Sequence, residues 1–300
     1  MAGTVAVCLA VHRPDPELLR RQLASLDAQT YRERALVRED EEAGSGAYRA
    51  FERCLARVPP AAAYVAPCDQ DDVWHPDKLT VLVDALEATG ALLAYCDVRV
   101  VDRGGRVLSE TYWTDRDNGW DDMGDLLATN VVTGAASVVR RAVLDVALPF
   151  PPEVDGSFHD HWLALCALAL GDLTYVDRPL LDYVQHGANV VGHSERGRRR
   201  AVRRRGRPRE PWRVRAARDR ERHVVRPQVM ARALLDRAGE RMAPAKRRAV
   251  ERAARGDEGW IDVARLMGLA LREQMNPRRT LDARRRAARG AVWARLARGR

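Results

Sequence analysis

The chain has 300 residues, of which 46% are hydrophobic, and it carries a formal net charge of +9. This composition excludes a disordered chain and allows one large α/β domain with an appendage. The longest apolar run, Trp162–Leu170, is too short to cross a bilayer, which takes roughly 20 residues, and no signal peptide is visible.

The charge is divided unevenly along the chain. Residues 193–300 hold 34 Lys and Arg against 12 Asp and Glu, a net charge of +22, whereas residues 1–192 carry a net charge of −13. We therefore expect an acidic globular domain over residues 1–192 and an Arg-rich helical extension over residues 193–300. The five cysteines are scattered without a C-x-x-C pair, which argues against disulfides and zinc and is typical of a cytoplasmic protein.

Strands and helices alternate in the first part of the chain. Short continuous apolar runs indicate strands buried on both faces, and Asp15-Pro16 is a typical helix start. The first predicted elements are strand Thr4–Val11, a helix from Pro16 to about Gln29, strand Ala35–Arg38, helix Tyr48–Ala56 and strand Ala61–Pro67.

The same alternation continues after the third strand. It predicts a mostly parallel sheet covered by helices on both sides, with ligands beyond the carboxyl ends of the strands. The later predicted elements are a helix from Pro76 to Gly90, strands Leu92–Cys96 and Val98–Val101, a hairpin arm at Val107–Leu108, strand Val131–Val139 interrupted by Gly134, helix Trp162–Leu170, and helical segments Val224–Ala238 and Trp260–Leu271.

Carboxylates are concentrated directly after the third strand. Asp69, Asp71 and Asp72 stand within four positions, and their mutual repulsion is costly unless a cation offsets it. A hard divalent ion, Mg²⁺ or Mn²⁺, is the simplest such cation. The alternative is that these acids only begin the helix near Pro76, but one acid would be enough for that role, so the pattern favours a site.

The segment 69–79, DQDDVWHPDKL, resembles the signature of family 2 glycosyltransferases, above all their rhamnosyltransferase-like branch. The resemblance covers roughly residues 3–192. It implies a Rossmann-like GT-A fold and an inverting, metal-dependent enzyme that uses a dTDP- or UDP-sugar as donor. Further matching segments, in the expected order, are 22–31 (QLASLDAQTY), 130–134 (NVVTG), 159–164 (HDHWLA) and 183–192 (YVQHGANVVG).

The resemblance implies a role for each residue that matches the family pattern. Asp160 is the expected catalytic base, which removes the proton of the acceptor hydroxyl. The metal would be held against the donor diphosphate and would neutralise charge on the leaving group. The expected metal ligands are Asp69, Asp71 and His186; the donor-binding residues are Asp40, Asp72, Trp74 and Lys78; and the acceptor-binding residues are Thr133, Gly134, His159 and Trp162.

Several of these residues also have a purely structural interpretation. Asp160 stands where an N-cap of the following helix is common, and His186 is compatible with an ordinary surface loop. Gly134 is compatible with a plain bulge. The tryptophans beside the motifs are as often packing residues as ligand platforms.

The chain departs from the family pattern after its second strand. The family continues there with an acidic turn that binds uracil or thymine and with a further helix and strand. In this chain residues 38–46 lead almost at once into the helix at Tyr48, so about one αβ unit is missing. Asp40 is the remaining acid that is expected to contact the base.

Other functions compete with this interpretation. Residues 69–73 also fit the D-x-D-x-[T/V] motif of haloacid-dehalogenase-type phosphatases, in which Asp69 would be a nucleophile. A degenerate transferase whose basic extension binds a membrane or nucleic acid is a further alternative. Nucleic acid is disfavoured because no recognition motif accompanies the arginines.

The basic extension suggests where the enzyme works. A basic helical segment can bind anionic lipid head groups, so we expect a cytoplasmic enzyme that associates peripherally with the inner face of the cell membrane. A solvated or partner-binding extension is nearly as well supported. The acceptor would be a glycan or a lipid-linked glycan in cell-surface polysaccharide or glycolipid synthesis, and the branch resembled suggests rhamnose as the sugar.

Overall fold

The computed structural model describes residues 3–41, 44–112, 119, 122–186, 214, 217–218 and 220–256. Within these ranges the strands are β1 (Val5–Val11), β2 (Arg34–Asp40), β3 (Tyr64–Cys68), β4 (Val73–Trp74), β5 (Leu93–Asp102), β6 (Val107–Ser109), β7 (Ser137–Arg140) and β8 (Leu173–Gln185). The α-helices are α1 (Pro16–Asp27), α2 (Gly46–Ala56), α3 (Lys78–Thr89), α4 (Met123–Ala128), α5 (Leu144–Ala147), α6 (His159–Leu170), α9 (Arg226–Ala238) and α10 (Pro244–Arg255).

All of these strands belong to one sheet, in the order β2-β1-β3-β7-β5-β8-β4, with β6 paired to β5. Pairing is parallel where β1 contacts β2 and β3 and where β5 contacts β8. It is antiparallel at β7, β6 and β4. The long pairings of the sheet are thus parallel, as predicted, and the antiparallel pairings involve the short strands β4, β6 and β7. The hairpin from β5 to β6 is antiparallel because a parallel pair would need a long crossover connection.

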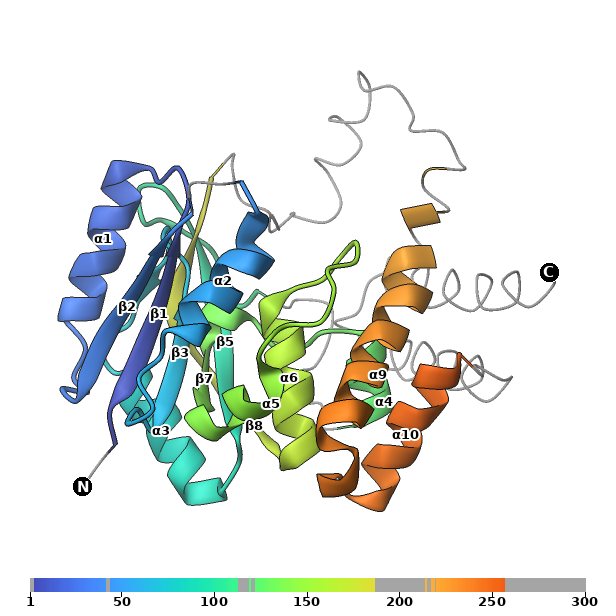
Figure 1. Ribbon diagram of the computed structural model, residues 1–300. Coiled ribbons are helices and arrows are strands. Elements are labelled where there is room, and N and C mark those ends of the chain that lie inside the picture. The colour runs from blue at the N-terminus through green and yellow to red at the C-terminus, as the bar shows by residue number, and fades with distance from the viewer. Residues whose placement is uncertain are drawn as a thin grey trace.

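Two hydrophobic cores lie on opposite faces of this sheet (Figure 1). Successive side chains of β1 point to opposite faces, so Ala6 and Cys8 join the core under α2 and α6, whereas Val7 and Leu9 join the core under α1 and α3. Burial on both faces explains why β1 reads as an unbroken apolar run.

Most of the predicted helix ends are present. The Asp15 carboxylate accepts hydrogen bonds from the backbone N–H groups of Glu17 and Leu18 and caps α1. Gly90, with a φ of 70°, ends α3 in the left-handed conformation. The chain passes from β2 through α2 directly to β3, and β2 pairs only with β1 among the described residues, as the predicted loss of an αβ unit requires.

The prediction of a strand over Val131–Val139 is wrong in its first half. Residues 134–136 form a 3₁₀ turn, η1 (Gly134–Ala136), and the strand starts only at Ser137. The backbone is diverted there because the Gly134 N–H donates to the Asp160 carboxylate rather than to a neighbouring strand. Strand β8 was not predicted from the sequence.

The helices α9 and α10 pack on the body of the protein beside α6, on the opposite side from α1 (Figure 1). Met230, Ala231 and Leu234 of α9 belong to the same core as α6. The predicted helix over Val224–Ala238 is therefore present, and the prediction over Trp260–Leu271 lies outside the described residues. No helix in the described part of the chain is long and apolar enough to span a membrane.

Candidate active site

The acidic cluster Asp69–Asp72 follows β3 at its carboxyl end, as predicted. His186, at the end of β8, places its Nε2 atom 2.7 Å from Oδ2 of Asp71. Burial, together with the neighbouring carboxylates of Asp71 and Asp160, raises the pKa of Asp69 to about 7. The structure therefore brings together Asp71 and His186, two of the predicted metal ligands, and Asp69 is near enough to the predicted base for the Asp160 charge to affect its pKa.

The predicted donor-binding side chains of Asp72, Trp74 and Lys78 are buried, and their role in donor binding stays a prediction. Asp72 and Trp74 are each 2% exposed and Lys78 is fully buried. The Lys78 Nζ atom lies 3.0 Å from the centroid of the Trp74 ring. Burial lowers the pKa of Lys78 to about 7. Lys78 acts behind the cluster, where its charge favours the ionised forms of Asp69 and Asp72.

Buried polar side chains of α1 and of the residues just after it hold the loop that carries the acidic cluster. Gln29 donates through Nε2 to the His75 carbonyl at 2.8 Å and accepts from the Leu79 N–H at 3.1 Å. Ser25 accepts from the Trp74 N–H at 3.1 Å. Residues 22–31 (QLASLDAQTY), one of the segments that match the family, thus have a physical role. Their amide and hydroxyl groups replace the backbone hydrogen bonds that an irregular loop lacks.

Gln70, the second residue of the DQDD motif, connects the cluster to the first strand. Its Nε2 atom donates to the His12 carbonyl at 2.9 Å, and its Oε1 atom accepts from the His12 N–H at 2.8 Å. The two bonds fix the loop after β1 against the loop after β3. Sequence reasoning missed this role, although a lone amide among carboxylates was a signal.

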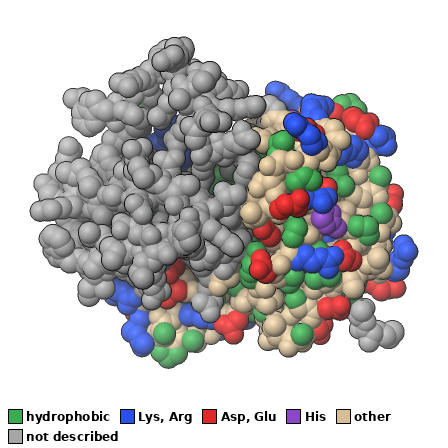
Figure 2. Space-filling model, turned by 180° about the vertical axis from the view of Figure 1, so that it is seen from behind, with side chains coloured by type: hydrophobic (Ala, Val, Ile, Leu, Met, Phe, Trp, Pro, Cys, Tyr) green, Lys and Arg blue, Asp and Glu red, His purple; other side chains and the backbone are tan. Residues whose placement is uncertain are grey.

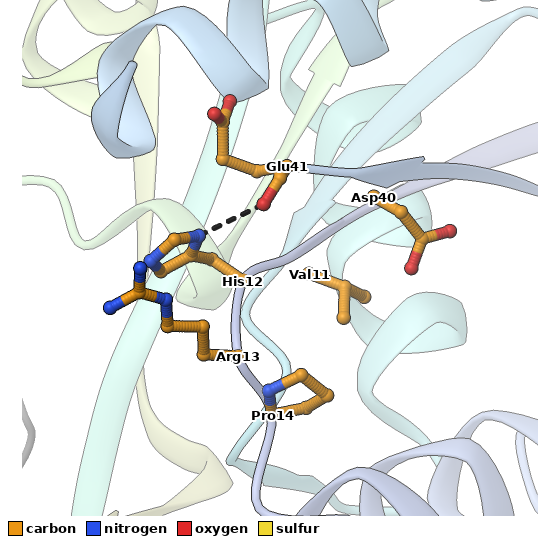
Figure 3. A pocket seen from close by; sticks show the side chains of 6 residues that line it. All are labelled: Val11, His12, Arg13, Pro14, Asp40 and Glu41. Carbon is orange, nitrogen blue, oxygen red and sulfur yellow. Dashed lines mark hydrogen bonds between the residues drawn. The ribbon is translucent and has the colours of Figure 1, made fainter. Parts of the chain in front are cut away.

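A pocket of about 380 Å³ opens where β1 and β2 end. It is lined by Val11, His12, Arg13, Pro14, Asp40 and Glu41 (Figure 3). Asp40, the predicted contact of the donor nucleobase, therefore lines a pocket. The sequence did not predict that His12 and Arg13 also line it. Arg13 has a φ of 42°, a left-handed conformation that is strained for a residue with a side chain and is found most often at functional sites.

The two acids of the pocket differ in what they contact. Glu41 accepts from the N–H and hydroxyl of Ser45 and pairs with Arg53, and these hydrogen bonds lower the pKa of Glu41 to about 2. It is engaged at the start of α2. The Asp40 side chain points away from Glu41 (Figure 3) and pairs with Arg38 at the surface. Asp40 is thus the acid that a ligand can reach.

Asp160 lies in the first turn of α6, but it is not the N-cap, a position held by Phe158. Its Oδ1 atom accepts from Asn130 Nδ2 at 2.9 Å and its Oδ2 atom accepts from the Gly134 N–H at 3.2 Å. Burial raises the pKa of Asp160 to about 6, against the effect of these hydrogen bonds. A carboxylate with its pKa near neutrality is suited to accept and release a proton.

Three of the predicted acceptor-binding residues are buried and packed within the protein, and their contact with an acceptor stays a prediction. Trp162 is fully buried and donates through Nε1 to the Ala147 carbonyl at 2.8 Å. The His159 ring is 8% exposed and stacks on Phe51 with 3.6 Å between centroids. Gly134 approaches α6 rather than a ligand, since an added Cβ would lie 2.4 Å from His159 Nε2. Only Thr133 of the predicted acceptor set keeps partial exposure.

The comparison with protein families decides the class of the domain. Residues 16–147 match the family described as Glycosyl transferase family 2. Over these residues the chain matches a family 2 glycosyltransferase domain. The matched range contains the acidic cluster after β3 and the Asn130–Gly134 segment that holds Asp160. The phosphatase interpretation of the DQDD motif is therefore set aside.

Solved structures show the same fold for this transferase domain. The crystal structure of S. aureus TarS 1-349 is 10% identical with a TM-score of 0.52, over 84% of this chain and 69% of that chain. The complex of S. aureus TarS 1-349 with UDP-GlcNAc is 10% identical with a TM-score of 0.50, over 99% and 91%. No curated protein matches the sequence. The GT-A architecture predicted from the sequence is thereby confirmed.

The residues present are of the kind that would hold a divalent cation. Asp69, Asp71 and His186 supply oxygen and nitrogen ligands, and one oxygen of the neighbouring Asp72 is buried without a hydrogen-bond partner. Within the described residues, no three His, Cys, Asp or Glu side chains already converge as a metal site. Asp71 and His186 instead contact each other, and a cation would replace that hydrogen bond.

Proposed function

We propose that the transferase domain moves a sugar from a nucleoside-diphosphate sugar to an acceptor hydroxyl, with inversion at the anomeric carbon. The observation that carries this proposal is the closeness of the acidic cluster to Asp160. Asp69 directly follows β3, and η1, whose Gly134 N–H donates to the Asp160 carboxylate, packs on β3. The Asp160 carboxylate accordingly contributes, after burial and Asp71, to the raised pKa of Asp69.

The donor is proposed to be a UDP- or dTDP-sugar. Its base would lie in the pocket at the ends of β1 and β2, where the exposed Asp40 carboxylate can accept the N–H of uracil or thymine. The TarS structure with UDP-GlcNAc supports a UDP-sugar as the first donor to test. Rhamnose, which the sequence resemblance suggested, stays in the donor panel.

Asp69 and Asp71, with His186, are proposed to hold Mg²⁺ or Mn²⁺ near the donor diphosphate. When bound, such an ion offsets the negative charge that develops on the leaving diphosphate. Gln70 holds the cluster at a fixed place beside the nucleotide pocket through its two bonds to His12. The charge of the buried Lys78 offsets part of the rise in pKa that burial causes at Asp69 and Asp72.

Asp160 is proposed to take the proton from the acceptor hydroxyl as that oxygen attacks the anomeric carbon. Asn130 and the Gly134 N–H hold the carboxylate from behind, so its direction is set before the acceptor binds. Attack opposite the leaving group inverts the anomeric centre. Thr133 and the aromatic ring of Phe158, which is 37% exposed, are the proposed contacts of a glycan or lipid-linked acceptor.

The test is a donor-turnover screen with Mn²⁺ or Mg²⁺, in which release of nucleoside diphosphate from UDP-GlcNAc, UDP-glucose and dTDP-rhamnose is measured. Asp71→Asn is expected to weaken donor binding, and Asp160→Asn is expected to lower turnover at least a hundredfold while donor affinity stays the same. Asp84→Asn, on the exposed side of α3, is the matched control. Cation-independent turnover, or full turnover by Asp160→Asn, would contradict the proposal.

A further inference from the structure

A loop of the acceptor side, Phe150–Phe158, leads directly into the helix that carries Asp160. It is irregular in structure, since it lies between α5 and α6 and contains no helix or strand. It ends at Phe158, the N-cap of α6. Any movement of this loop would shift the first turn of α6 and therefore the Asp160 carboxylate.

Two arginines from the C-terminal part of the chain bind this loop. Arg222 contacts both carboxylate oxygens of Asp155, at 2.7 and 3.3 Å. Arg226, at the start of α9, donates through Nη1 to the Gly156 carbonyl at 2.7 Å. Gly156 has a φ of 79°, and a Cβ added there would come within 3.1 Å of both arginine side chains. The arginines and the turn therefore fit each other closely.

The other side of the loop is held by α2. The Phe150 N–H donates to Glu52 at 2.6 Å, and Arg49 donates to the Pro151 carbonyl at 3.3 Å while pairing with Glu52. The loop thus has one support from the transferase domain itself and one from the segment that the sequence assigned to the basic extension. The second support is the unexpected one.

The burial of Arg226 indicates a role beyond packing. Its side chain is only 9% exposed, and its Nε atom is buried without a hydrogen-bond partner among the described residues. A buried guanidinium with an unused donor is costly compared with an apolar side chain of similar size. The charge of Arg226 interacts with Asp160 and with His161, so the guanidinium lies near the first turn of α6.

We infer that Arg222 and Arg226 are positioning residues for the catalytic base, and that the chain needs its α9 segment to complete the acceptor side of the active site. The arginines fix the Asp155–Gly156 turn, the turn fixes the start of α6, and α6 carries Asp160. This inference rests on the proposed function for the role of Asp160. We call the contacts of Arg222 and Arg226 with Asp155 and Gly156 the arginine clamp. The existence of this clamp does not depend on the proposed function.

A matched control exists at the other end of α6. Lys246 of α10 donates to the Gly171 carbonyl at 2.6 Å and contacts Asp172 at 3.1 Å. It is thus a cation that secures the C-terminal end of the same helix, far from Asp160. Loss of Lys246 should weaken the fold as loss of Arg226 does, but it should leave the acceptor loop in place.

The experiment compares Arg226→Gln, Arg226→Lys and Lys246→Gln in the full chain. Hydrogen–deuterium exchange of residues 150–161 is measured together with turnover of UDP-GlcNAc, or of the donor that the screen identifies, and with UDP affinity. Arg226→Gln is expected to increase exchange in this segment and to lower kcat on the order of ten- to a hundredfold, with UDP affinity unchanged. Arg226→Lys keeps one donor for the Gly156 carbonyl, so it should partly restore the low exchange and the kcat. Lys246→Gln should change neither the exchange of residues 150–161 nor the kcat.

The outcomes separate the clamp from the proposed function. Unchanged exchange at residues 150–161 in Arg226→Gln overturns the clamp, whatever happens to turnover. Increased exchange at residues 150–161 in Arg226→Gln, together with an unchanged kcat, overturns the role of Arg226 in positioning Asp160. If Asp160→Asn itself keeps full turnover, the assignment of the base fails, and the role in positioning a base fails with it, while the exchange comparison still decides whether the arginines hold the loop.

Discussion

At the scale of single residues, the site is built from polar groups whose surroundings change their chemistry. Asp160 shows this most directly. Its carboxylate accepts hydrogen bonds from Asn130 and Gly134, which favour the anion, and yet burial outweighs them and raises its pKa to about 6. The result is a carboxylate that is mostly ionised at neutral pH and still basic enough to accept a proton.

The pH dependence of the reaction should follow from this pKa. A base works only when ionised, so with the cation at saturation kcat/KM is expected to be constant above about pH 7. It should fall about tenfold per pH unit below about pH 6, as protonated Asp160 accumulates. The measurement is a pH–rate profile with the best donor. A profile that stays flat down to pH 5 would show that another group takes the proton.

Gly134 is required for steric reasons. A methyl group there would lie 2.4 Å from His159 Nε2 and 3.2 Å from the Asp160 Cβ, and His159 cannot move away because it stacks on Phe51. Gly134→Ala is expected to reduce the free energy of unfolding by about 1–3 kcal/mol and to lower kcat, as measured by urea unfolding and donor turnover. Gly104→Ala, at a hairpin turn where a Cβ meets only an Asp102 oxygen at 3.3 Å, should change little.

At the scale of elements, α1 is more than a cover for the sheet. Its inner face carries Gln22 and Ser25, and Gln29 follows two residues after its end. Gln22 bonds to Cys68 at the end of β3, and Ser25 and Gln29 bond to Trp74 and His75 in the segment between β3 and α3. The acidic cluster is part of that segment. The helix therefore positions the site from the opposite side to α6, and a helix with only apolar positions on this face would leave the loop without hydrogen-bond partners.

Replacement of one of these amides should show its contribution. Gln29→Leu removes the bonds to the His75 carbonyl and the Leu79 N–H. The His75 carbonyl keeps its bond from the Lys78 N–H, whereas the buried Leu79 N–H loses the Gln29 acceptor. We expect a loss of about 2–3 kcal/mol in the free energy of unfolding, measured by urea denaturation, and weaker cation-dependent donor binding. Gln228→Ala on α9 is the comparison, and an equal loss there would argue against a specific role of Gln29.

At the scale of the whole molecule, the basic extension begins as part of the folded body. Arg237 donates to the Val146 and Ala147 carbonyls and lies 5.6 Å from the centroid of the Trp162 ring. Arg222, Arg226 and Arg237 of this region thus serve as structural hydrogen-bond donors to the transferase domain. On the face seen in Figure 2, acidic and basic side chains are intermixed over the described surface, so that part of the protein presents no large basic patch to an anionic partner on this face.

Two truncations separate folding from membrane binding. A chain that ends at residue 192 loses α9 and uncovers the apolar surface that Met230, Ala231 and Leu234 cover, so it should be aggregation-prone or melt well below the full chain. A chain that ends at Gly256 keeps α9 and α10 and should fold. If residues 257–300 bind membranes, only the full chain will sediment with vesicles rich in anionic lipid, and equal sedimentation of both would contradict that proposal.

The sequence by itself determined the class of this protein. The alternation of apolar runs and helix signals predicted β1, α1, β2, α2 and β3 in order, because each is a local pattern that the chain cannot satisfy in another conformation. The DQDD segment at the end of the third strand indicated the site, since a cluster of carboxylates at a strand end is costly without a cation.

Only the tertiary structure decided which residues of the motifs are exposed. Asp72, Trp74, Lys78, His159 and Trp162 belong to the motifs, and yet they are buried, because burial depends on which elements pack above a residue and not on its neighbours in sequence. The contact of Asp71 with His186 and the hold of Arg226 on the loop before Asp160 join residues that are far apart in the sequence. No local pattern encodes such contacts, because they form only when the helices dock on the sheet.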